Sequence, residues 1–361
     1  MDIQSVIIVF LPLIYLFIYT LSANKRDKIN RIPIWSVVLL LLVLCATMAT
    51  VPNEQGDRLL YKFGYERYRS FEITPEDAKD YGWGLFNIIC GKFIGDNITI
   101  FFLIVAFFYV SSYFFLAKKY IKKQYIGCFV LLSVGALGFK SYGVNTLRAG
   151  FALAILYYSI CFDKRILKVV LLIVSVSIHK SMIIPIASYL LAYIIQSKKY
   201  TYYIWFLCLA ISIVNVDLSG LFERFGFVDK RVDSYIGSLE TGNSIYAQGF
   251  RIDFVIYSIF PMVIEYFYSK RLTFTKEAFY SRVFRTYLVA NAIWLLVIRI
   301  TFTDRVAYLS WFMIPFIVLY PVLNYPQKFK HPQSIVLYIM YTLIGINVFL
   351  SSRSIIPQNV F

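Results

Sequence analysis

The chain has 361 residues, of which 59% are hydrophobic, 19% are aromatic and only 16% are charged. Soluble domains carry about 25% charged residues and rarely contain a succession of apolar stretches of near-spanning length. The composition therefore excludes a soluble enzyme, a secreted disulfide scaffold and a disordered chain. It predicts an all-α polytopic membrane protein that forms a single integral membrane domain over residues 1–361.

The first apolar stretch, residues 3–21, has no basic residue before it and four soon after it. Because Lys and Arg gather on the cytoplasmic side, this pattern predicts a retained helix whose N-terminus lies outside. At about 20 residues per crossing, the apolar stretches predict about twelve transmembrane helices, with both chain ends outside. They are expected near residues 3–22, 34–51, 98–117, 125–139, 147–162, 166–179, 181–196, 201–217, 252–269, 283–300, 306–323 and 334–351.

The charge distribution agrees with this topology. The expected cytoplasmic segments hold 20 of the 36 Lys and Arg residues against three acids, whereas the outer segments hold equal numbers of both signs. One acid, Glu265, falls inside an expected helix. The net charge of +16 is thus a positive-inside bias and not a nucleic-acid footprint, so DNA or RNA binding is excluded.

Two outer segments, residues 52–97 and 218–251, are long enough to form structure. In the first, Thr74-Pro75-Glu76 combines a cap residue, a first-turn proline and an early acid, which predicts the start of a helix. Apolar residues then recur at spacings of three and four, so this helix is expected to lie on the outer leaflet. The recurring residues are Trp83, Phe86, Cys90 and Phe93.

The sequence contains no motif for a resident cofactor or metal. The five cysteines are scattered without paired spacing, and no phosphate-binding glycine loop, H-E-x-x-H or D-x-D motif occurs. We therefore expect no cofactor and a metal-independent chemistry.

Three arginines stand where helix electrostatics disfavours them. Arg148, Arg251 and Arg305 lie at the N-terminal ends of helices that are expected to run inward from the outer face. A bound anion, held by exposed N–H groups and by the guanidinium fork, would account for each. Converging, they would form a cradle for phosphate or pyrophosphate; the alternative for each arginine is contact with lipid phosphates.

The segment before Arg148 is also too short for a full crossing. Residues 125–139 span about 22 Å as a helix, against a hydrocarbon core of about 30 Å. The outer surface should therefore dip here and place Lys140, Tyr142, Asn145 and Arg148 in a cavity lined by protein.

Candidates for proton transfer and sugar contact lie on the same side. His179 is either a proton carrier beside the anion or a hydrogen-bonded hairpin residue. Asp57 and Asp304 could orient an arginine or accept a proton, although Asp304 is more simply a helix N-cap. The side chains that could stack on sugar rings, unless they only belong to an aromatic belt, are Tyr61, Tyr142 and Tyr235.

Five short stretches on the outer side give a wider pattern. They are Gly56-Asp57 followed by Tyr61, residues 145–150, residues 177–181, residues 231–235 and residues 304–308. In this order the chain resembles, over most of its length, the EpsG-like and Wzy-type polysaccharide polymerases of bacterial O-antigen and capsule assembly. The resemblance implies a membrane glycosyltransferase of GT-C-like architecture in the bacterial inner membrane, with its active site facing the periplasm.

The resemblance also implies substrates and partners. Such proteins join oligosaccharide repeat units carried on undecaprenyl pyrophosphate, and a chain-length regulator is a possible partner. Arginines would stabilise the pyrophosphate leaving group, and His179 or Asp57 would accept the acceptor's proton. The residues expected to bind pyrophosphate are Arg148, Arg305, Arg251, Arg231 and Lys180.

One stretch departs from the family pattern. Members often carry an acidic residue, proline and glycine before the outer helix, whereas this chain has Asp80-Tyr81-Gly82. No role is therefore predicted for Asp80.

Two other functions fit parts of the pattern. An O-antigen ligase uses the same kind of donor with a different acceptor and would show the same arginines. A flippase or transporter of lipid-linked glycans needs sites near the bilayer midplane and often has repeated halves. Because the candidate residues gather at one face, the sequence favours the enzyme over the transporter.

Overall fold

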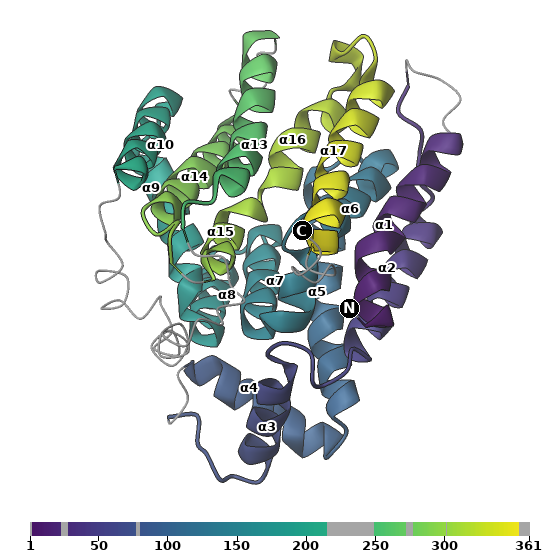
Figure 1. Cartoon of the computed structure of the whole chain (residues 1–361), viewed down its shortest axis with the longest axis vertical. Coiled ribbons are helices and arrows are strands. Elements are labelled where there is room, and N and C mark those ends of the chain that lie inside the picture. The colour runs from purple at the N-terminus through teal and green to yellow at the C-terminus, as the bar shows by residue number, and fades with distance from the viewer. Residues whose placement is uncertain are drawn as a thin grey trace, which may run out of the picture. The chain divides into compact units, whose positions relative to one another are not determined.

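The computed structural model is helical wherever it is described, and no strand occurs among those residues (Figure 1). The chain divides into two compact units, residues 1–182 with 318–361 (unit 1) and residues 183–317 (unit 2). The single integral membrane domain stays a prediction. The described residues are 2–22, 28–76, 80–214, 249–271, 277–300 and 302–353.

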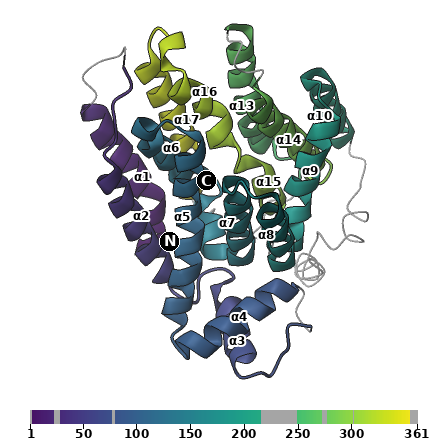
Figure 2. The ribbon, with the colours of Figure 1, turned by 180° about the vertical axis from the view of Figure 1, so that it is seen from behind.

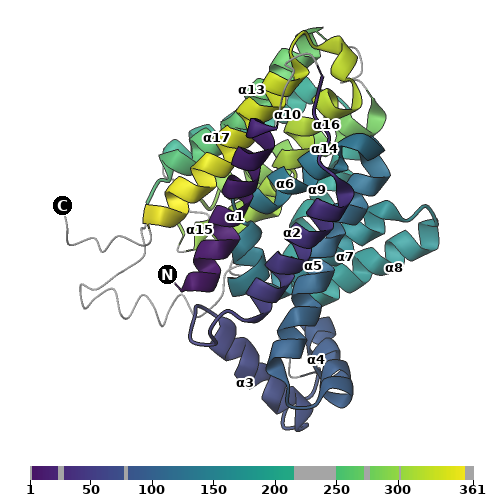
Figure 3. The same ribbon diagram turned by 90° about the vertical axis from the view of Figure 1, so that its right-hand side faces the viewer.

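The long helices of unit 1 follow the apolar stretches of the sequence. α5 is capped by Asn97, whose side chain accepts a hydrogen bond from Ile100 N at 3.2 Å, and it carries Lys118 and Lys119 in its last turn. It packs against α2 and α7, as the views from behind and from the side show (Figures 2 and 3). The helices are α1 (Ile3–Leu21), α2 (Ile34–Ala49), α3 (Arg58–Arg69), α4 (Tyr81–Ile94), α5 (Ile98–Tyr120), α6 (Ile126–Gly135), α7 (Leu147–Cys161), α8 (Arg165–Ile178) and α17 (Pro332–Arg353), with part of α16 (Ile314–Asn324).

The basic loops of unit 1 meet at one end of its helices. Lys119 at the end of α5 forms an ion pair with Asp163 after α7, at 2.6 Å. Arg31 before α2 donates to Gln124 before α6. These segments were all expected on the cytoplasmic side, and their contacts place them together.

α3 and α4 lie at the opposite end of α5 (Figure 1). The sequence predicted that a helix starts after Thr74, but α4 begins only at Tyr81, so that prediction of the helix start was wrong. Trp83 and Cys90 are buried in protein, whereas Phe93 is exposed. Only part of the predicted apolar stripe is thus available to a lipid surface, because much of it packs inside unit 1.

The connection between α6 and α7 contains a wide π-type turn, Ser141–Asn145. α6 has only ten residues, about 15 Å of helix, so it is even shorter than the sequence suggested. A Cβ on Gly150 would lie 2.2 Å from the carbonyl oxygen of Tyr142. Glycine is therefore required for α7 to pass this close to the turn.

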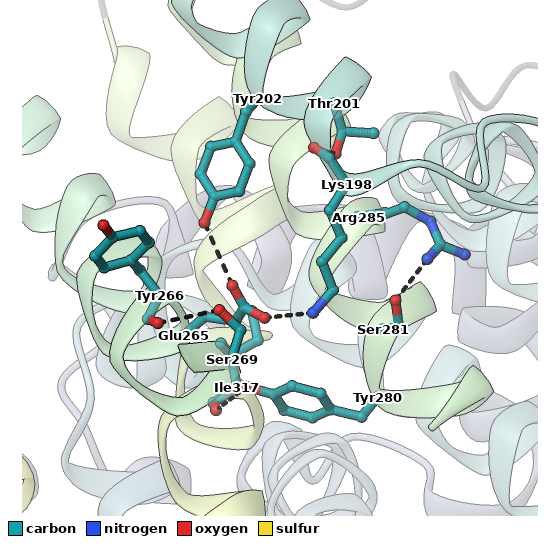
Figure 4. A network of polar contacts seen from close by, with 10 residues as sticks. All are labelled: Lys198, Thr201, Tyr202, Glu265, Tyr266, Ser269, Tyr280, Ser281, Arg285 and Ile317. Carbon is teal, nitrogen blue, oxygen red and sulfur yellow. Dashed lines mark hydrogen bonds and ion pairs between the residues drawn. The ribbon is translucent and has the colours of Figure 1, made fainter. Parts of the chain in front are cut away.

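Unit 2 contains a buried ion pair (Figure 4). Glu265 of α13, the acid expected inside a helix, is 1% exposed and pairs with Lys198 at the start of α10. Tyr202 donates to the other carboxylate oxygen at 3.4 Å. Lys198 lies between the expected helices 181–196 and 201–217, in a segment expected on the cytoplasmic side, and it neutralises the carboxylate. The helices of this unit are α9 (Ile183–Ile194), α10 (Lys198–Ile213), α13 (Ile252–Arg271), α14 (Ala278–Leu295), α15 (Thr303–Trp311) and the first residues of α16.

Among the described residues, five helical segments are long and apolar enough to cross a membrane, and three shorter apolar helices accompany them. The chain is a helical membrane protein. Each of the twelve predicted segments overlaps a helix, while the count of twelve crossings and the GT-C-like architecture stay predictions. The five are Ile3–Leu21, Ile98–Tyr120, Ile252–Lys270, Thr303–Asn324 and Pro332–Ser352, and the shorter three are Ile34–Ala49, Leu147–Cys161 and Lys180–Ile194.

Candidate active site

A buried carboxylate, that of Asp80, gathers three polar groups at the end of unit 1 where α3 and α4 lie. Its Oδ2 accepts a hydrogen bond from Arg148 Nη1 at 2.9 Å and lies 3.3 Å from His179 Nδ1. Its Oδ1 accepts from the backbone N–H of Lys180 at 3.2 Å. The Asp80 side chain is 1% exposed, so these partners replace water around it.

Three separate elements bring these groups together. Asp80 directly precedes α4, and its carbonyl oxygen accepts from the N–H groups of Trp83 and Gly84, which starts the helix. Arg148 lies in the first turn of α7, and His179 is the residue that ends α8. The site thus depends on how α4, α7 and α8 pack.

Close packing of α4 on α8 requires a glycine at position 82. A Cβ there would lie 2.3 Å from Ser177 Oγ and 2.9 Å from the Ser177 carbonyl carbon. On the other side, Ser175 Oγ donates to Ala152 O at 2.8 Å in a buried contact that joins α8 to α7. α8 is therefore packed against α4 at Gly82 and is joined to α7 through Ser175.

Aromatic side chains support the same junction. Phe86 of α4 packs on Phe151 of α7 with ring centroids 4.4 Å apart, and Trp83 contacts Phe151 edge-on. Tyr61 of α3 packs edge-on against Trp83 at 5.8 Å. Packed aromatic pairs of this kind fix the elements that carry a site.

The partners also set the charge of Asp80. Burial alone would raise the pKa of its carboxyl, but the hydrogen bond of His179, the charge that His179 carries when it is protonated, the charge of Arg148 and the Lys180 N–H outweigh burial and hold the pKa below its ordinary value of 3.8. Asp80 is therefore ionised at neutral pH. The Arg148 and His179 side chains are 19% and 26% exposed, so both remain within reach of a ligand.

The structure brings together three of the residues singled out from the sequence, namely Arg148, His179 and Lys180, the last through its backbone. Asp57 directly precedes α3 and is half-buried. The Tyr142 ring is buried and packs edge-on against Tyr109.

The arginines of unit 2 have local partners. Arg251 forms a two-pronged ion pair with Asp253 and lies 3.7 Å from the centre of the Phe254 ring, and Arg305 lies over Phe302. Their convergence with Arg148 stays a prediction. Arg231 and Tyr235 lie outside the described residues.

Asp304 does not cap its helix. α15 begins at Thr303, and the cap position belongs to Phe302, whose φ of 58° is unusual for a bulky residue. The N-cap expected for Asp304 was therefore wrong: a helix capped by Asp304 would begin at residue 305, whereas α15 begins two residues earlier, at Thr303.

The sequence predicted no role for Asp80, and the structure corrects this. Its partners Arg148 and His179 are 68 and 99 residues away along the chain. The sequence did contain one signal for this role: an acidic residue, Asp80, directly precedes a helix whose second residue, Gly82, allows close packing.

The fold and this charged cluster define a class of protein, the helical membrane proteins with a charged site at one end of their helices. The model of the EpsG family matches residues 38–359, and the chain belongs to the EpsG family. This membership indicates a membrane protein with a polysaccharide polymerase type of function. No curated protein and no solved structure matches the chain.

Proposed function

We propose that the chain is a glycosyltransferase of the bacterial inner membrane that polymerises oligosaccharide repeat units carried on undecaprenyl pyrophosphate, at the periplasmic face. The observation that carries this proposal is the cluster in which Arg148 and His179 share one oxygen of Asp80. A permanent cation and a proton acceptor are thereby held side by side, as this reaction needs.

The position of the cluster supports the periplasmic orientation. The basic loops gather at one end of unit 1, where Lys119 pairs with Asp163, Arg31 donates to Gln124 and the Lys122 backbone N–H donates to Asn324. The Asp80 cluster lies at the other end of α5 and α7. Because basic loops favour the cytoplasm, the cluster would face the periplasm.

The reaction transfers a glycan from its lipid pyrophosphate to a hydroxyl of the next lipid-linked repeat. The new bond forms between the acceptor oxygen and the anomeric carbon of the donor. The bond from that carbon to the pyrophosphate oxygen breaks, and its electron pair leaves with the lipid pyrophosphate. The acceptor's proton passes to a base, for which His179 and Asp57 are the candidates.

Arg148 would stabilise the charge that develops on the leaving group. It lies in the first turn of α7, where the N–H groups of a helix start also favour an anion. This chemistry requires no metal. Further positive groups proposed for the pyrophosphate are Lys180, Arg251, Arg305 and Arg231.

Of the two described tyrosines singled out from the sequence, Tyr142 is buried, whereas Tyr61 is half-buried beside Trp83 and is the one proposed to contact sugar rings. A chain-length regulator is a proposed protein partner.

Polymer length in cells tests the proposal. Arg148→Ala and Arg305→Ala should each abolish long polymer while the protein and single-repeat surface glycan persist. Arg67→Ala is the matched control, because Arg67 lies in the outer segment that carries Asp80, is exposed and forms a 3.6 Å surface ion pair with Glu72. Normal ladders in both Arg148→Ala and Arg305→Ala would contradict the proposal.

A purified assay separates the competing activities. The full-length protein in nanodiscs, given the lipid-linked repeat alone, should produce a ladder of repeat numbers. A ligase would require a different acceptor, and a transporter would leave the repeat chemically unchanged. A requirement for a different acceptor, or a repeat that stays chemically unchanged, would overturn the proposed polymerase activity.

A further inference from the structure

The contact between Asp80 and His179 decides which ring nitrogen of the histidine carries a lone pair. An ionised carboxylate can only accept hydrogen bonds, so Nδ1, at 3.3 Å from Oδ2, must be the nitrogen that carries the proton. Neutral imidazole has a single N–H, and Nε2 is therefore left as the basic nitrogen.

The same carboxylate restrains its partners from several sides. Oδ2 is shared by Arg148 from α7 and His179 from the end of α8, and Oδ1 is held by the Lys180 backbone. Rotation of the carboxylate would break at least one of these bonds. At 1% exposure the carboxylate is also shielded from water, which strengthens the contacts.

We propose that Asp80 is a positioning residue, which holds His179 in the tautomer whose Nε2 accepts the acceptor's proton and keeps Arg148 beside it for the leaving group. This inference rests on the proposed function and selects His179 over Asp57 as the base. The proton moves from the acceptor hydroxyl to Nε2 as the glycosidic bond forms, and the electron pair of the broken bond leaves with the pyrophosphate. Asp80 stays ionised and stabilises the imidazolium that results.

Conservative variants of Asp80 test this role in the purified protein. Asp80→Asn presents an amide that can itself donate to Nδ1 and so permits the wrong tautomer. Turnover should fall by about 10²–10⁴-fold, the usual contribution of an acid–base group. Asp80→Glu keeps the charge and should restore part of the loss. Asp96→Asn, which removes an exposed carboxylate of the same outer segment, should leave turnover unchanged.

The pH profile separates positioning from a merely structural role. Asp80 and Arg148 are charged groups beside His179, and Asp80→Asn removes the negative one. The neutral imidazole is then favoured at lower pH, so the acid limb of the pH–rate profile should move to lower pH. The fold-loss of turnover in the double variant Asp80→Asn/His179→Gln should also be far smaller than the product of the two single fold-losses.

Several results would overturn the inference while leaving the proposed function standing. One is normal turnover in Asp80→Asn when Arg148→Ala is inactive. Another is a loss in Asp80→Asn with an unmoved pH profile and no rescue by Asp80→Glu, which would mark a structural residue. A third is a large loss in Asp57→Asn with near-normal turnover in His179→Gln. If Arg148→Ala and Arg305→Ala are also both normal, the proposed function itself fails.

Discussion

The buried ion pair of unit 2 predicts an asymmetry between two single substitutions (Figure 4). Glu265 is 1% exposed, whereas Lys198 is 24% exposed and has a flexible stem. Removing the lysine with Lys198→Met strands a carboxylate that has no access to water. Removing the glutamate charge with Glu265→Gln leaves an ammonium that can turn toward water.

The magnitudes follow from this difference in burial. Loss of one partner from a buried pair costs about 3–5 kcal/mol, which is the range expected for Lys198→Met. Glu265→Gln should cost only about 1–3 kcal/mol, the value for a disrupted buried hydrogen bond, since the amide still accepts from Tyr202. In the double variant the stranded charge is gone, so part of the Lys198→Met loss should be recovered.

Unfolding in mixed micelles with increasing denaturing detergent measures these free energies of unfolding. Lys199→Met is the matched control, because the neighbouring lysine lies on the exposed side and contacts the Tyr203 ring. Equal losses for Lys198→Met and Glu265→Gln, or losses below about 1 kcal/mol for both, would refute the reasoning.

Three further outcomes are expected. Gly82→Ala should abolish polymer at normal protein abundance, because its Cβ would lie 2.3 Å from Ser177 Oγ. Gly64→Ala is the control and should retain polymer, because nothing lies within 4 Å of a Cβ at that position. Polymer ladders from Gly82→Ala like those from Gly64→Ala would count against the packing of α4 on α8 at this glycine. Arg58→Met should lower the free energy of unfolding by about 2–4 kcal/mol, because Arg58 donates to the Met48 and Ala49 carbonyls at the end of α2 and its guanidinium stacks on the Phe102 ring. An unchanged unfolding curve would contradict this prediction. The pKa of Asp80 is lower in the folded protein than its ordinary value of 3.8, so the stabilisation from its carboxylate is complete above about pH 4 and is lost as the pH falls through the folded pKa. The difference in free energy of unfolding between the wild type and Asp80→Asn should therefore shrink only in that acidic range. A difference that already shrinks between pH 7 and 5 would be inconsistent with this pKa.

The helices could be predicted from the sequence because their signal is local. Residues 98–117 form a mainly apolar stretch without a charged residue, and the observed helix α5 differs only at its C-terminal end. The start of α4 was misplaced because Thr74-Pro75 is a strong local start signal, while the observed start at Tyr81 depends on Asp80 and on packing against α8.

The candidate site could be predicted only in part. Arg148 and His179 were identifiable because each residue type is unusual for its place in the topology. Asp80 was not, because its importance comes from contacts across 68 and 99 residues of chain that no local pattern encodes. The pairing of Glu265 with Lys198 was missed for the same reason, since it is a contact between α13 and α10.

We propose that Arg148 and His179 form one site for a lipid pyrophosphate donor. An experimental structure of the protein with undecaprenyl pyrophosphate bound would test this proposal. We expect phosphate oxygens within hydrogen-bond distance of the Arg148 guanidinium, with His179 Nε2 directed to the side where the sugar would lie. A pyrophosphate bound elsewhere, with Arg148 turned only to Asp80, would contradict it.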